Sequence, residues 1–146
     1  MRSSVRAFTL LEVLLSVAAL TVIAGISLPI YQSFQVRNDL DIAATTVAQS
    51  CRRAEVLAQA SDGDTNWGVH IQPGSIVLFQ GTIYAVRNET FDEIFTMPTS
   101  VVPSGMSDVV FEKFTGMPMT TGTTTLTSST NETRTITINA KGMVNF

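Results

Sequence analysis

The strongest hydrophobic pattern of the chain lies in its first thirty residues. From Phe8 to Ile30 the only ionisable side chain is that of Glu12. As a helix this run would extend about 35 Å at ~1.5 Å per residue, enough for a hydrocarbon core of ~30 Å. Two arginines precede the run, and the positive-inside rule holds that end in the cytoplasm. The pattern therefore predicts one transmembrane helix, with the rest of the chain beyond the membrane.

From Tyr31 onward the pattern becomes that of an amphipathic helix. Small or apolar residues recur at steps of three and four, and polar residues mark the opposite side. The helix is predicted to end near Ala60, before the break at Ser61-Asp62-Gly63-Asp64. The predicted buried stripe consists of Leu40, Ala43, Ala44, Val47, Cys51, Ala54 and Ala58.

After Asn66 the hydrophobic period changes to two, which is typical of β-strands separated by turn residues. Residues 120–133 are rich in threonine and serine and indicate an exposed loop with a partial edge strand. The predicted fold class is α+β. A long N-terminal helix, half membrane-spanning and half amphipathic, packs on an antiparallel β-sheet domain. The strands are expected at 67–71, 76–79, 82–86, 94–97, 109–114, 133–138 and 143–144.

Charge and composition exclude several functions. The formal net charge is −3, and residues 37–146 hold 7 basic and 11 acidic residues, which disfavours a nucleic-acid binder. A single cysteine excludes a disulfide within the chain, and a single histidine excludes a histidine-rich metal cluster.

The segment Ala7-Phe8-Thr9-Leu10-Leu11-Glu12 resembles the prepilin processing motif of type IV pilins and type II secretion pseudopilins. The resemblance implies a leader over residues 1–7, which prepilin peptidase removes between Ala7 and Phe8, followed by N-methylation of Phe8. It makes Glu12 the fifth residue of the mature chain. It also places Pro29 where many members of the family carry a proline that kinks or locally melts the helix.

Glu12 is the residue that distinguishes the hypothesis of a filament subunit from that of a simple membrane anchor. A carboxylate inside an apolar span costs roughly 2.5–3.5 kcal/mol, so it usually has a partner. Pairing with the Phe8 amine of a neighbouring subunit would offset both charges. The alternative is that Glu12 lies near the membrane surface at the positive start of the helix. A secretory signal peptide is a further alternative, but it would have a shorter apolar core than this run and small residues before its cleavage site.

The second part of the chain resembles the GspH/FimT minor pseudopilins in layout. The resemblance rests on Arg52-Arg53-Ala54-Glu55, on Phe111, on Phe114-Thr115-Gly116 and on Lys141-Gly142-Met143. It implies a pilin-like organisation with an assembly helix over residues 8–35 and a globular domain over 36–146. That domain would hold an amphipathic helix at 36–60 and β-structure at 66–146.

The function implied is that of a minor pseudopilin or pilin in a membrane-anchored filament, with the type II secretion pseudopilus as the first interpretation. The alternative is a FimT-like minor pilin of the type IV pilus, involved in pilus assembly or DNA uptake. The expected partners are other pilin subunits through the N-terminal helix, prepilin peptidase and the bacterial inner membrane. The globular domain would lie in the periplasm. A membrane-anchored domain that never assembles is a third hypothesis.

Other residues offer little chemistry. Asp62–Gly68 faintly copies the start of a calcium loop, but a solvated turn explains it better. His70 is interpreted as a half-buried strand residue and Cys51 as a small buried hydrophobe. The acids of 92–93 and of 108 and 112 could meet in the fold, although their spacing does not require it. We therefore expect no enzyme activity, no cofactor and no metal site.

Overall fold

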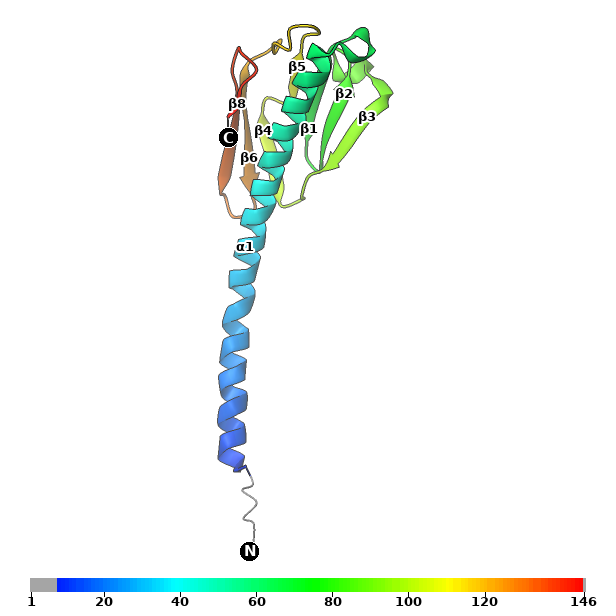
Figure 1. Cartoon of the computed structure of the whole chain (residues 1–146). Coiled ribbons are helices and arrows are strands. Elements are labelled where there is room, and N and C mark those ends of the chain that lie inside the picture. Colours follow the sequence, from blue (N-terminus) through cyan, green and yellow to red (C-terminus); the bar gives the residue numbers. More distant parts are fainter. Residues whose placement is uncertain (1–7, 146) are drawn as a thin grey trace, which may run out of the picture. The chain divides into compact units, whose positions relative to one another are not determined.

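The computed structural model describes residues 8–145, without the side chains of residues 26–30. The chain divides into two compact units, Met1–Gln35 and Val36–Phe146. One helix, α1 (Leu10–Gln59), contributes its first part to the former and its last part to the latter (Figure 1). All regular β-structure belongs to the second unit.

Eight strands form two antiparallel sheets of four. Sheet A has the order β3-β2-β1-β5, and sheet B has the order β4-β6-β7-β8. In Figure 1 the last turns of α1 lie across both groups of strands. The strands are β1 (Trp67–Gln72), β2 (Ser75–Gln80), β3 (Asn88–Thr96), β4 (Val101–Gly105), β5 (Asp108–Phe111), β6 (Gly122–Ser128), β7 (Thr133–Ile138) and β8 (Val144–Asn145). Two short 3₁₀ helices, η1 (Asp62–Asp64) and η2 (Tyr84–Val86), lie in the connections.

The core of the second unit lies between α1 and both sheets. All seven residues of the predicted stripe are at most 1% exposed, which confirms the stripe. They pack with Val69, Leu78 and Phe111 of sheet A and with Leu126 and Ile136 of sheet B in one hydrophobic cluster. Because most helix side chains in this cluster are small, the helix can approach the strands closely and fill the space at high density.

Ion pairs fasten the polar side of α1 to the sheets. Arg37 pairs with Glu132 at 2.7 Å, next to β7, and Asp41 pairs with Arg134 of β7 at 2.9 Å. On the other sheet, Arg53 pairs with Glu93 of β3 at 2.6 Å. These pairs are exposed, so each adds only about 0–1 kcal/mol, and the apolar core supplies most of the stability.

The chain changes from sheet B to sheet A at a bend between β4 and β5. Gly105 at the end of β4 has a φ of +89°, which side chains with a Cβ rarely adopt. A Cβ on Gly105 would also lie 2.6 Å from the carbonyl oxygen of Thr123 on the neighbouring strand. Beyond the bend, the N–H of Ile71 on β1 donates to the carbonyl of Ser107 at 2.8 Å, so the two sheets meet at this point.

The predicted fold class is wrong. The expectation was one long N-terminal helix, half of it membrane-spanning, packed on an antiparallel sheet domain. The chain instead divides into two compact units, and the boundary between them falls after Gln35, within the bounds of α1. The strands form two sheets, because the bend at Gly105 makes β4 and β5 pair with different neighbours.

The strand predictions were right for the hairpin of β1 and β2 and for β7, and wrong in three places. No strand was predicted at β4. Residues 82–86 contain the 3₁₀ helix η2, because Tyr84 folds over the outer face of sheet A. The threonine-rich tract contains β6, an inner strand paired with β4 and β7. Threonine is β-branched and favours strands, and buried Thr124 donates its hydroxyl to the Met106 carbonyl at 2.6 Å.

No helix in the described part of the chain is both long and apolar enough to cross a membrane. The prediction of a transmembrane helix over 8–35, and with it a single-pass inner-membrane location, is therefore wrong.

The inner position of β6 gives a stability prediction. Leu126 is fully buried between the sheets and α1, so Leu126→Ala should lower the free energy of unfolding by about 2–5 kcal/mol. Thr123→Ala on the exposed side of the same strand should cost less than about 1 kcal/mol. Urea denaturation followed by circular dichroism measures both variants. Equal, small effects would show that residues 122–128 do not form an inner strand.

Candidate functional site

The residues of the prepilin-like motif lie at the start of α1. Thr9 directly precedes the helix, and its Oγ1 accepts a hydrogen bond from the backbone N–H of Glu12 at 3.2 Å. Glu12 is exposed in the first turn. The spacing of Thr9 and Glu12 is that of a capping box, in which a hydroxyl and a carboxylate satisfy free N–H groups at a helix start. The observed cap engages the backbone N–H of Glu12, and the sequence analysis did not identify it.

The two remaining motif positions are only partly described. Phe8 is 80% exposed, whereas Ala7, on the other side of the predicted cleavage point, lies outside the described residues. Pro29 lies within the bounds of α1, but its side chain is among those outside the described set. Cleavage between Ala7 and Phe8, and any effect of Pro29 on the helix, remain predictions.

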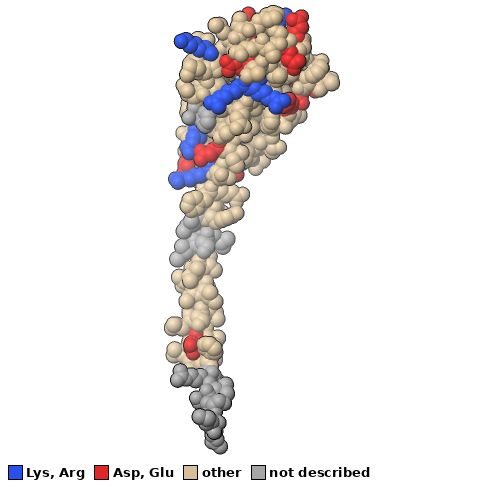
Figure 2. Space-filling model, viewed as in Figure 1, with Lys and Arg blue, Asp and Glu red and all other residues tan. Residues whose placement is uncertain are grey.

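The first turns of α1 expose apolar side chains on every side. In the first unit the described surface is tan except for one acidic group, and Glu12 is the only charged residue of residues 8–35 (Figure 2). The hydroxyls of Ser16 and Thr21 donate to backbone carbonyls one turn earlier, both at 2.7 Å. Such a helix has no polar face to turn toward water. The exposed large side chains are Leu10, Leu11, Val13, Leu14, Leu15, Val17, Leu20, Val22 and Ile23.

The second unit carries a polar and aromatic column on the face of sheet A that points away from α1. His70 Nδ1 lies 2.8 Å from Asp108 Oδ1, and Ser107 donates its hydroxyl to Asp108 Oδ2 at 2.7 Å. The His70 ring stacks on Tyr84, with 3.8 Å between centroids and 11° between planes. The Arg87 guanidinium lies 3.9 Å from the centroid of the Tyr84 ring.

The strand register creates this column. His70 is paired with Asp108 of β5 and with Val77 of β2, so the three side chains share one face of the sheet. On the next row Gly68 leaves room for the Phe79 ring, since a Cβ there would lie 2.6 Å from Phe79 Cζ. Tyr84 meets that ring edge-on at 5.4 Å. The connection between β2 and β3 thus covers a small second apolar cluster on the outer face.

Arg87 holds the end of this connection. Its Nε donates to Asp92 Oδ2 at 2.7 Å, and its Nη1 donates to the carbonyl of Tyr84 at 3.0 Å. The hydrogen bond with Asp92 raises the pKa of Arg87 above its ordinary value. The other carboxylate oxygen of Asp92, Oδ1, is buried without a hydrogen-bond partner. The cation therefore belongs to the internal structure of the unit.

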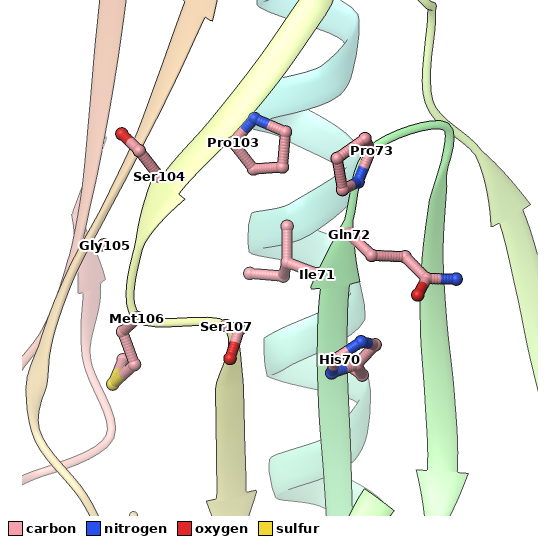
Figure 3. Close-up of a pocket in the computed structure, with 9 residues that line it drawn as sticks. All are labelled: His70, Ile71, Gln72, Pro73, Pro103, Ser104, Gly105, Met106 and Ser107. Carbon is pink, nitrogen blue, oxygen red and sulfur yellow. The ribbon is translucent and has the colours of Figure 1, made fainter.

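A hollow lies where the two sheets meet. Its volume is about 290 Å³, and Figure 3 shows its walls, formed by the end of β1 and the turn at Pro73 on one side and by β4 and the following bend on the other. Pro103 and Pro73 lie toward one end and His70 toward the other. Pro103 lies on β4, an edge strand of sheet B, and because proline removes a backbone donor this edge is poorly suited to accept a further strand.

The acidic candidates from the sequence do not meet. Asp92 pairs with Arg87, Glu93 with Arg53, and Asp108 with His70, so each has a separate structural partner. Glu112 accepts a hydrogen bond from the hydroxyl of Thr115 at 3.1 Å. The partner of His70 was missed because Asp108 is 38 residues away, and strand register cannot be read from the hydrophobic pattern.

The calcium-like segment forms the turn after α1. It contains η1, and Asp64 pairs with Lys113 at 2.9 Å. Within residues 8–145, no group of three histidine, cysteine or acidic residues is placed to hold a metal ion. Cys51 is fully buried on the helix stripe, and desolvation raises the pKa of its thiol to about 12.

Comparison of the chain with protein families, curated proteins and solved structures finds no match. The comparisons therefore provide no family evidence for a pseudopilin, and the membrane part of the expected description is corrected by the absence of a membrane-spanning helix in the described residues.

The raised pKa of Cys51 predicts an unreactive thiol. Thiolate is the reactive form, and at pH 8 a pKa of about 12 leaves on the order of 1 in 10,000 thiols ionised. Iodoacetamide should leave the native chain unmodified over an hour and modify it fully in denaturant, as measured by intact mass. Because Cys51 is the only cysteine, rapid modification of the native chain would show that α1 does not pack its stripe against the sheets.

Proposed function

We propose that this chain is a structural subunit of a pilin-type filament, without catalytic activity. The observation that carries the proposal is the apolar surface around residues 10–25, which the other described residues do not cover. In this proposal the cover is supplied by the corresponding helices of neighbouring subunits. The filament could be a type II secretion pseudopilus or a type IV pilus, and nothing in the chain favours one over the other.

The exposure of the first turns supports a packed helix bundle. Leu10 is 81% exposed and Leu15 is 70% exposed, although burying one such side chain contributes about 1.5–3 kcal/mol. An exposed apolar surface larger than a few hundred Å² marks an interaction site in most soluble proteins. Since Ser16 and Thr21 satisfy their hydroxyls within the helix, their burial among other helices would leave no unpaired donor.

Glu12 supports the same proposal through its charge. A carboxylate among apolar helices needs a partner, and the mature terminus of a neighbouring subunit would offer one in the Phe8 amine. This step requires removal of residues 1–7 by prepilin peptidase, as the motif implies. The proposed partners are therefore that peptidase and the other subunits of the filament.

DNA binding is not proposed for the globular unit. Five of its seven basic residues are engaged in ion pairs with nearby acids, namely Arg37, Arg53, Arg87, Lys113 and Arg134. In the view of Figure 2, basic and acidic side chains are intermixed over this unit. Phosphate contacts dominate the affinity for nucleic acid and require cations that are available to the ligand.

The charge of Glu12 can be separated from its helix-capping role. Glu12→Gln keeps a residue that completes a capping box but loses the charge, and Glu12→Asp keeps the charge on a side chain one methylene shorter. If the carboxylate pairs with a neighbouring amine, Glu12→Gln should reduce filament incorporation at least tenfold and Glu12→Asp should be intermediate. Incorporation is measured by crosslinking to the other subunits in cells that lack the wild-type copy.

Intact mass supplies the control, because every variant must begin at Phe8 and carry one added methyl group. A chain that retains Met1 would contradict the processing step itself. Should Glu12→Gln assemble as well as the wild type, the carboxylate serves only as a helix cap and the pairing account is wrong.

A further inference from the structure

A hollow of about 390 Å³ lies on the outer face of sheet A, beside the connection between β2 and β3. Its walls include Ile83, Tyr84 and Val110, which are apolar along most of their surface. His70 and Asp108, the hydrogen-bonded pair of the column described above, also line it. A mostly apolar hollow with a few polar groups at one end has the usual composition of a ligand site.

The polar end of this hollow carries a negative charge. Asp108 is the only acidic residue that lines it, and its side chain is 44% exposed. The nearest cation of the column, Arg87, is already paired with Asp92 at 2.7 Å. A neutral His70 donates one proton to the carboxylate and leaves the charge in place. The hollow therefore complements a cation carried on an apolar stem.

The hydrogen bonds of Asp108 select the kind of cation. Oδ1 already contacts His70 and Oδ2 already accepts from Ser107, so the two oxygens are not both available to a planar fork. A guanidinium gains most from binding a carboxylate through two parallel bonds, whereas an ammonium needs only one lone pair. An ammonium group is therefore favoured over a guanidinium.

The single acid also selects the source of that ammonium. A free diamine would find no carboxylate for its second charge among the residues that line the hollow. One partly exposed ion pair contributes about 1 kcal/mol or less, so a useful site needs further contacts around it. A lysine on a folded partner supplies them, and its four methylene groups can lie along Ile83 and Val110.

From this geometry we infer that the hollow beside β5 receives a lysine side chain of a partner protein, with its ammonium on Asp108 and its stem against the apolar wall. The site lies entirely within Val36–Phe146 and does not depend on filament assembly.

The test uses the full chain and the proton resonances of two residues that each occur once. His70 lines the hollow, and Trp67 donates its indole N–H to the Asp62 carbonyl and reports on the fold. Nα-acetyl-lysine N-methylamide should shift the His70 resonance with a Kd of roughly millimolar order and leave the Trp67 resonance unchanged. The arginine analogue and cadaverine should bind no more tightly, and the Nε-acetylated lysine analogue at least threefold more weakly.

Asp108→Asn should weaken binding of the lysine analogue at least threefold, whereas the matched change Glu112→Gln, at an exposed acid just after β5, should not. Raising the salt concentration to about 0.5 M should weaken binding in the unaltered chain, which tests the charge without a substitution. Equal binding of the Nε-acetylated analogue, or binding that is insensitive to both Asp108→Asn and salt, would overturn the inference.

Discussion

The close approach of one helix to two sheets is the constraint on which the globular unit depends. α1 can contact both sheets because four of the seven residues of its buried stripe are alanine, with Leu40, Val47 and Cys51 as the larger members. The bulky side chains come from the strands, with Phe111 on sheet A and Leu126 on sheet B. The bend at Gly105 then connects the two sheets around the helix, and the ion pairs at its edge fix its rotation.

Apolar side chains are buried in one unit and exposed in the other. In Val36–Phe146 the apolar residues face a shared core, while the charged residues pair with one another at the surface. In residues 10–25 the same kinds of side chain point outward on all sides, and Glu12 is the only charge. A core explains the first arrangement without further partners. The second arrangement leaves apolar surface that the other described residues do not cover, and this difference is the physical basis of the proposed filament role.

The sequence predicted the features that depend on local hydrophobic periodicity. It did not predict the features that depend on which distant strands pair with one another. The helix stripe and the first hairpin follow from periods of 3.6 and 2, and both were confirmed. The division into two sheets follows from pairing partners, which periodicity does not reveal. The sequence analysis interpreted β6 as a loop because the strand is mostly threonine. Leu126 is the only large apolar residue on its buried side. Likewise, Asp108 was not recognised as the partner of His70, because only the pairing of β1 with β5 brings them together.

Expression of residues 36–146 alone tests most directly the claim that the core is complete without the apolar helix start. About 110 residues are enough for an independent core, and the stripe begins only at Leu40. The account predicts a soluble monomer that unfolds in one cooperative transition, with Cys51 protected from iodoacetamide as in the full chain. An aggregated fragment, or one without a cooperative transition, would show that residues 10–25 belong to the core and would contradict the account.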